Sequence, residues 1–186
     1  VDAAIIAAQR AFPAWRGRPV AERARRLRRA AGSLEARRFE FAALMVFESG
    51  KPWREADGDV TEAVDYLRYY AQQAEELQQP RSLIEPPGEQ NEYLREARGV
   101  TVVIAPWNFP LAILAGMTVA ALATGNPVIV KPSGFSPMVA YRLVLLLHTA
   151  GVPPEAVQFL PGSGATVGQA LVQHPAVSTI AFTGSN

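Results

Sequence analysis

Four short loops in the second half of the chain carry the residues whose types and spacing could bind a ligand or assist a reaction. They are Pro106-Trp107-Asn108-Phe109-Pro110, Lys131-Pro132-Ser133-Gly134, Pro161-Gly162-Ser163-Gly164 followed by Gly168, and Thr183-Gly184-Ser185. Backbone amides at a helix N-terminus attract phosphate, and glycine lets the backbone approach it closely. The third loop has the spacing G-x-G-x-x-x-G, one residue longer than the usual dinucleotide fingerprint. A pyrophosphate-bearing cofactor and a simple turn before a helix N-cap explain these glycines equally well.

Lys131 and Asn108 are the polar side chains in these loops that most need a partner. Lys131 is the only lysine after residue 99 and stands at the end of an apolar, β-branched run. Because a lone buried ammonium is costly, we expect an anionic or hydroxyl-rich ligand, or else a carboxylate from outside this segment. Asn108 lies between two aromatic residues and two prolines. Its amide could donate to a developing oxyanion, or it could satisfy backbone groups in a tight turn.

A regular alternation of strands and helices must position the loops. From Gly99 onward the sequence predicts strands at 100–105, 127–130, 157–160 and 177–182, separated by helices at 111–124, 137–150 and 165–173. This order is typical of right-handed βαβ units in an α/β fold, a Rossmann-like parallel sheet with helices on both faces. Ligands bind such sheets at the carboxyl ends of the strands, where the four loops lie.

Helices are predicted for the first half of the chain. Apolar residues recur at helical spacing over 20–34, 39–47 and 55–77, and the second of these helices is expected to stop at Ser49-Gly50-Lys51-Pro52. A proline-rich connector follows at 80–88. Alternating charge over 92–98 favours an exposed ribbon or an edge strand.

Charge is divided very unevenly between the two halves. Residues 1–99 hold 16 of the 18 Lys and Arg and 16 of the 17 Asp and Glu. A half with so few charges is expected to bury both faces of its strands or to pack against polypeptide outside this chain. We therefore expect a helical segment at 1–80, a connector and exposed ribbon at 81–98, and a sheet domain at 99–186.

Composition excludes several classes of protein. With 186 residues the chain has room for about one domain with a core, and its net charge of +1 argues against general binding to nucleic acid. The absence of Cys rules out disulfides, thiolate metal sites and a cysteine nucleophile within these residues, and we expect no metal. The longest clean apolar segment, 111–125, is shorter than the roughly 20 residues that a membrane-spanning helix needs.

Taken together, the loops resemble the successive motifs of the NAD(P)-dependent aldehyde dehydrogenases. The order and spacing of Pro106–Pro110, Gly125-Asn126, Lys131-Pro132, Pro161–Gly164 and Phe182–Ser185 match that family, and the N-terminal helical part is similar as well. Residues 109–113, Gly116 and the helix at 62–70 most resemble the 1-pyrroline-5-carboxylate (L-glutamate γ-semialdehyde) dehydrogenases, including the dehydrogenase half of bifunctional proline-oxidising enzymes.

The resemblance implies oxidation of L-glutamate γ-semialdehyde to glutamate with NAD. In that chemistry a cysteine thiolate attacks the aldehyde, hydride passes to the nicotinamide, and a water activated by Glu releases the acid. Asn108 would donate to the oxyanion, Lys131 would bind the adenosine ribose, and Glu62 would line the aldehyde site, although a solvated helical Glu explains Glu62 equally well. The other cofactor contacts that it implies are Ile104, Pro106, Trp107, Ser133, Gly164, Gly168, Phe182, Gly184 and Ser185.

Two departures from the family pattern set further expectations. The catalytic Cys and the general-base Glu of the family follow the Phe-Thr-Gly-Ser turn. The resemblance therefore implies that residues 99–186 are a partial dinucleotide-binding domain without the catalytic domain, and we expect residues 1–186 to be inactive alone. His148 and His174 are expected to be structural. Many NAD-preferring members have a Glu where this chain has Gly134, which leaves NADP open beside NAD as the cofactor.

Other functions stay open at this stage. The chain could act on another aldehyde or reduce an acyl phosphate, or it could be a non-catalytic nucleotide-binding or assembly module that uses the helical half and the ribbon. Family members assemble through such a ribbon, so a homo-oligomer is expected for the full-length protein. We expect a cytoplasmic location and no membrane partner.

Overall fold

Four parallel strands form the sheet on which the loops stand. The computed structural model describes residues 1–79 and 83–184. The strands are β1 (Val100–Ile104), β2 (Val128–Lys131), β3 (Val157–Phe159) and β4 (Val177–Phe182), and their order in the sheet is β3-β2-β1-β4. Each predicted strand is confirmed within one or two residues. In the register, Val102 of β1 lies between Ile129 of β2 and Ile180 of β4.

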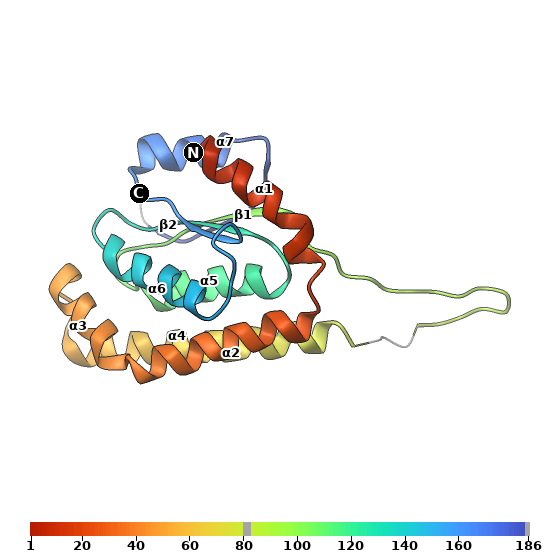
Figure 1. The fold of residues 1–186 in the computed structure, drawn as a ribbon, viewed down its shortest axis with the longest axis horizontal. Coiled ribbons are helices and arrows are strands. Elements are labelled where there is room, and N and C mark those ends of the chain that lie inside the picture. Colours follow the sequence, from red (N-terminus) through yellow and green to blue (C-terminus); the bar gives the residue numbers. More distant parts are fainter. Residues whose placement is uncertain (80–82, 185–186) are drawn as a thin grey trace.

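Helices cover both faces of this sheet, as the sequence predicts. They are α1 (Asp2–Arg16), α2 (Val20–Ala36), α3 (Arg38–Ser49), α4 (Trp53–Leu77), α5 (Ala112–Ala123), α6 (Pro137–Thr149) and α7 (Gln169–Gln173), with a π-helical turn η1 (Gly164–Gly168) before α7. Figure 1 shows α1 and α7 on one face, and α5 and α6 on the other. The sequence predicts one helix over 165–173, whereas the structure begins that segment with the π-helical turn.

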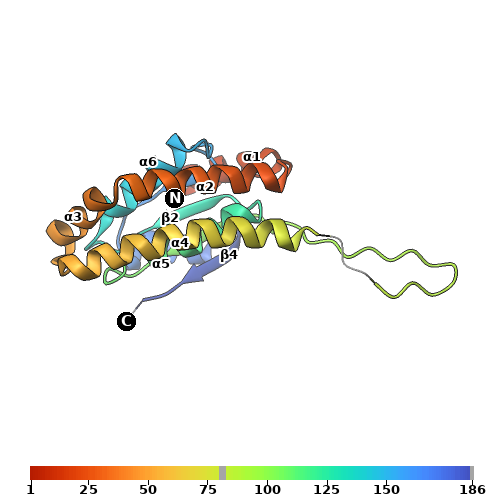
Figure 2. The ribbon, with the colours of Figure 1, turned by 90° about the horizontal axis from the view of Figure 1, so that it is seen from below.

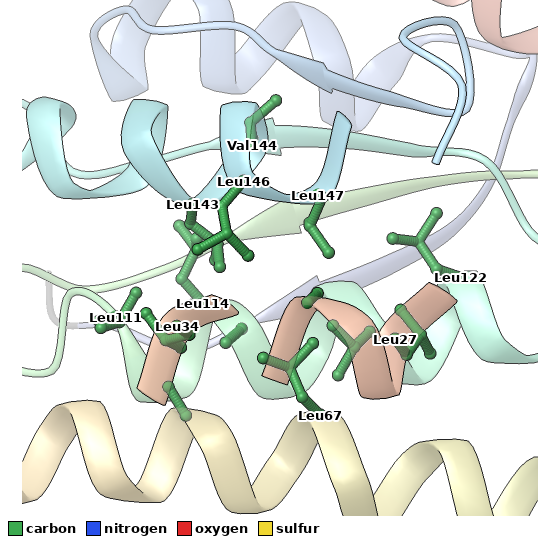
Figure 3. Close-up of a cluster of buried hydrophobic side chains, with 14 of the residues drawn as sticks. Leu27, Leu34, Leu67, Leu111, Leu114, Leu122, Leu143, Val144, Leu146 and Leu147 are labelled. Carbon is green, nitrogen blue, oxygen red and sulfur yellow. The ribbon is translucent and has the colours of Figure 1, made fainter. Parts of the chain in front are cut away.

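Strand side chains alternate between two hydrophobic clusters because their period is two residues. Val103, Val128 and Val130 face the larger cluster, whereas Val102 and Ile129 face a smaller one with Ile5 and Ala8 of α1. Figure 3 shows the larger cluster, where leucines of α2, α4, α5 and α6 meet, among them Leu27, Leu67, Leu114 and Leu143. The core is therefore shared between the charged half and the uncharged half of the chain.

α2 and α4 lie side by side as an outer layer over α5 and α6 (Figure 2). α3 ends at Gly50, whose φ of 66° is left-handed and favours glycine, and Lys51 and Pro52 lead directly into α4. This tight junction sets Lys51 beside the first turns of α4. The sequence correctly predicts the end of α3.

An extended arm leaves the body beyond the end of α4 (Figures 1 and 2). Residues 83–98 are exposed except for the partly buried Leu83 and Ala97, as expected, but they form no strand within the part of the chain that the structure describes. The alternation of charge suits extended backbone, and strand pairing would need a second edge that these residues do not meet. No helix within residues 1–79 and 83–184 is long and apolar enough to cross a bilayer.

Candidate active site

The loops that follow the strands start side by side at one edge of the sheet. Ile104, the last residue of β1, pairs with Lys131 of β2 and with Phe182 of β4. Backbone bonds continue this alignment just past the strands, because Thr183 N donates to Ile104 O at 3.2 Å and Leu160 N donates to Val130 O at 2.9 Å. The predicted cofactor residues Ile104, Lys131 and Phe182 are thus neighbours in space.

Lys131 is buried with few partners, as its sequence position suggests. It is 5% exposed, and its Nζ donates to Pro132 O at 3.0 Å. That carbonyl is its only hydrogen-bond partner among the described residues, which also supply no carboxylate to it. Burial lowers the pKa of Lys131. A lysine held this way keeps donor capacity for a hydroxyl-rich or anionic ligand.

The glycine-rich turn packs against the stem of this lysine. A Cβ on Gly168 would lie 3.5 Å from Lys131 Cε, and a Cβ on Gly162 would lie 2.3 Å from Val167 Cγ2. Ser163 caps the turn, because its Oγ accepts from Thr166 N at 3.1 Å. Gly162 and Ser163 therefore have structural roles, whereas the exposed Gly164 has no contact that requires a glycine.

The 106–110 loop is anchored by a buried ion pair that the sequence reasoning missed. Lys51 Nζ lies 2.6 Å from Asp59 Oδ2 and donates to Asn108 O at 2.8 Å. The ammonium also sits 4.0 Å from the centroid of the Phe109 ring. Asp59 Oδ1 accepts from Ala112 N, the first residue of α5, at 2.6 Å. The Asn108 side chain itself is exposed, and its amide has no hydrogen bond within the described residues.

A signal for this pair was present in the sequence. Asp59 occupies the apolar stripe of α4 between Ala56 and Ala63, where a carboxylate needs a buried partner. Burial raises the pKa of Asp59, while hydrogen bonds from Lys51 and from the Ala112 amide oppose that rise.

Two helix N-termini at this end of the fold are occupied by carboxylates of the helical half. Asp59 takes the first amide of α5, and Glu48 accepts from Met138 N at 2.6 Å and Val139 N at 3.0 Å in α6. These amides are therefore not free for a phosphate group, contrary to the general expectation for helix N-termini in such sheets.

Glu62 lies one helical turn beyond Asp59 and is partly buried. Tyr66 bonds the Glu62 carboxylate, which raises the pKa of Tyr66. The Tyr66 ring packs on α5, where a Cβ on Gly116 would lie 3.1 Å from Tyr66 Cδ2. Glu62 is thus held on the side of α4 that faces the start of α5.

The other predicted site residues lie around the same edge. Pro106 and Trp107 follow β1, with Trp107 half exposed. Ser133 Oγ accepts from Phe135 N at 3.3 Å. Gly184 follows β4, and Ser185 lies outside the described residues.

Both histidines make local backbone contacts, as expected for structural residues. His148 Nε2 lies 2.9 Å from Val157 O, and His174 Nδ1 accepts from Ala176 N at 3.1 Å.

Comparison with known proteins identifies a family that this chain matches and several relatives. A model of the aldehyde dehydrogenase family matches residues 1–186. 1-Pyrroline-5-carboxylate dehydrogenase 2 of Bacillus subtilis is 50% identical over 99% of this chain, and 1-pyrroline-5-carboxylate dehydrogenase 1 of Halalkalibacterium halodurans is 48% identical over the same share. The chain spans 36% of the length of each of these curated relatives.

Solved structures give the same picture. A variant of the Thermus thermophilus 1-pyrroline-5-carboxylate dehydrogenase superposes with a TM-score of 0.96 at 44% identity, covering 99% of this chain and 36% of that one. A Thermus 1-pyrroline-5-carboxylate dehydrogenase with bound NAD superposes with a TM-score of 0.93, covering 96% of this chain and 35% of that one.

Proposed function

The chain belongs to the aldehyde dehydrogenase family, and we propose that it forms the cofactor-binding, N-terminal part of an enzyme that oxidises L-glutamate γ-semialdehyde to glutamate with NAD. The observation that supports the substrate is the identity of 48–50% with 1-pyrroline-5-carboxylate dehydrogenases over 99% of this chain and 36% of their length. The geometry of the strand-end loops supports a nucleotide site at this edge of the sheet.

The residues at this edge fit a dinucleotide. Lys131 keeps unused donors in a buried setting, and the glycine turn lies against its stem, so Lys131 with Ser133 would hold the adenosine ribose. Gly164, Gly168, Gly184 and Ser185 would line the adenine and the pyrophosphate. The side chains expected to flank the cofactor are Ile104, Pro106, Trp107 and Phe182. When bound, NAD supplies the hydride acceptor for oxidation of the aldehyde carbon.

Asn108 would stabilise the negative charge that develops on the aldehyde oxygen. Its amide is exposed and unengaged within the described residues, so a substrate oxygen could meet it without displacing a protein partner. A single preorganised donor of this kind contributes roughly 3 kcal/mol to transition-state stabilisation. Glu62, held by Tyr66, would line the aldehyde site.

The nucleophile must come from outside these residues if it is a cysteine. Residues 1–186 contain no Cys. We therefore propose that residues 1–186 alone bind NAD without turning over an aldehyde. Many NAD-preferring members have a ribose-binding Glu where this chain has Gly134, and without that carboxylate the repulsion of a 2′-phosphate is weaker, so the binding of NADP is to be measured beside that of NAD.

The test uses the product of the full reading frame that encodes these residues. We expect it to reduce NAD with L-glutamate γ-semialdehyde and to do so faster than with short aliphatic aldehydes. Asn108→Ala should lower kcat by roughly 10²-fold while the Kd for NAD is unchanged. Turnover of other aldehydes but not of glutamate semialdehyde would overturn the substrate, and failure to bind NAD would overturn the cofactor site.

A further inference from the structure

Lys51 and Asp59 form an ion pair inside the protein. The two residues are 7% and 2% exposed, and their charged atoms are 2.6 Å apart. Several other ion pairs of the described residues, such as Arg38 with Asp57, lie at the surface. Desolvation of two charges offsets much of their attraction, so a buried pair is a poor device for stability alone. Its remaining hydrogen bonds indicate what else it does.

Both partners bond the backbone of one loop. Lys51 Nζ donates to Asn108 O at 2.8 Å, and Asp59 Oδ1 accepts from Ala112 N at 2.6 Å. The ammonium also stacks over the Phe109 ring at 4.0 Å, which is within the range of a cation–π contact. The pair therefore holds the loop in its middle and at its end, where α5 begins.

We propose that the Lys51–Asp59 ion pair is a positioning unit that sets where the Asn108 side chain stands. This inference rests on the proposed function, which gives Asn108 its role. Fixing the Asn108 carbonyl fixes the peptide plane that leaves its Cα. The side-chain amide has no hydrogen bond of its own within the described residues, so the anchored backbone, which sets the Cα–Cβ direction and the rotamers open to Asn108, is the constraint on where the amide can stand.

Accurate placement is worth much to an oxyanion donor. The donor must lie within about 3 Å of the oxygen that becomes charged, and a misplacement of about 1 Å can cost roughly 10²-fold in rate. Loss of the Lys51 bond frees the middle of the loop while leaving Lys131 and the glycine turn untouched. Pro106 and Trp107 of the same loop would flank the cofactor, but Lys131 and the glycine turn would hold its ribose and pyrophosphate, so the effect should appear mainly in kcat, with little change in the binding of NAD.

The experiment is a double-mutant cycle in the full-length protein. We expect Lys51→Met to lower kcat by roughly 30-fold to 100-fold and to leave the Kd for NAD within about twofold of wild type. If Lys51 acts through Asn108, then Lys51→Met combined with Asn108→Ala should be no more than about twofold slower than Asn108→Ala alone. A purely structural role predicts that the two losses multiply.

Arg38→Met is the matched control. It breaks the surface ion pair between Arg38 of α3 and Asp57 of α4. Asp57 is two residues before Asp59, and Arg38 has no hydrogen bond or ion pair with the 106–110 loop within the described residues. Its kcat should equal that of wild type. Lys51→Met leaves the charge of Asp59 uncompensated and could fail to fold for that reason. In that case the double variant Lys51→Met with Asp59→Asn replaces it, because it is neutral and keeps an acceptor for Ala112 N. This double variant should show the same loss of kcat.

Amide hydrogen exchange over residues 105–113 separates failure of this inference from failure of the proposed function. Faster exchange there in Lys51→Met but not in Arg38→Met supports the positioning role whatever the substrate is. An inactive wild type with glutamate semialdehyde counts against the proposed function alone. An active wild type in which Lys51→Met keeps kcat, or multiplies the loss of Asn108→Ala, overturns the positioning role.

Discussion

Replacing Lys131 with methionine is expected to raise the free energy of unfolding while it weakens the binding of NAD. Lys131 is 5% exposed as a residue, and its ammonium has a single hydrogen bond within the described residues, to Pro132 O at 3.0 Å. Three N–H donors are present on an ammonium, so two have no protein partner within the described residues and are open to a ligand. Methionine keeps nearly the same length and can pack against the glycine turn.

The magnitude follows from counting donors. Leaving buried donors of a charged group unsatisfied costs roughly 1–3 kcal/mol, and the bond to Pro132 O returns about 1 kcal/mol, so the variant should gain about 1 kcal/mol of stability. In the complex, two hydrogen bonds to ribose hydroxyls together contribute about 2 kcal/mol, so the Kd for NAD should rise about 30-fold.

The pH dependence gives an independent check. Burial lowers the pKa of Lys131 below its ordinary value of 10.5, so the folded state releases this proton at a lower pH than the unfolded state. Between the lowered pKa and 10.5 the unfolded state therefore binds more protons, and this group makes the free energy of unfolding rise with pH. Lys131→Met should lack that rise.

Urea denaturation from pH 7 to pH 10 and calorimetric titration with NAD measure both effects. Arg54→Met, at an exposed position of α4, is the control and should change neither quantity. A Lys131→Met protein that is less stable than wild type by about 1 kcal/mol, the size of one ordinary hydrogen bond, would refute the reasoning on burial. An unchanged Kd for NAD would refute the assignment of Lys131 to the ribose.

Substitutions at three further positions test the fold. Asn126→Ala should cost about 2–3 kcal/mol by urea denaturation, because Asn126 Oδ1 accepts from Gly99 N at 3.0 Å, and Asn126→Asp, which keeps that acceptor, should cost less. Two arginines, chiefly Arg37, lower the pKa of Glu40 from 4.5 to about 2. The stability that Glu40 adds is present above pH 4.5 and is lost as the pH falls toward 2, so Glu40→Gln should cost about 1 kcal/mol at pH 6 and less at pH 3. Leu67→Ala should cost about 2–5 kcal/mol in thermal or urea unfolding, because it leaves a cavity in the shared core.

Local patterns predicted most of the elements and one part of the site. β-Branched runs followed by helical periodicity gave the four strands and the helices between them, because these signals lie within a few residues of one another. The burial of Lys131 followed in the same way from its place at the end of such a run. The order of motifs carried the family, which the family match confirms.

Contacts between residues far apart in the chain could not be predicted from the sequence. Lys51 meets Asn108 across 57 positions, and Glu48 meets Met138 across 90. No local period reports such a contact, because it depends on how α3 and α4 pack against α5 and α6. Of these residues, only Asp59 gave a signal in the sequence, because it is a carboxylate within the apolar stripe of α4. The π-helical turn before α7 was missed because one inserted residue per turn changes the helical period too briefly to detect.

The uneven charge of the two halves has a physical explanation in the ends of α5 and α6. Carboxylates of the helical half meet the N-termini of both helices, with Asp59 at α5 and Glu48 at α6. Arginines of α2 meet the C-termini, where Arg23 Nε donates to Ala123 O at 3.0 Å and Arg26 Nε donates to Gly151 O at 2.9 Å. Every one of these contacts has the sign that the helix dipole favours.

The sheet half therefore needs few charges of its own, because the outer layer supplies the groups that satisfy its helix ends. Unsatisfied amides and carbonyls at four helix ends would be costly in an apolar interior, and the hydrophobic core that spans α2, α4, α5 and α6 brings the charged groups to them. The same packing that completes the core delivers Asp59, and with it Lys51, to the Asn108 loop. Stability of the outer layer and placement of the candidate oxyanion donor thus depend on one interface.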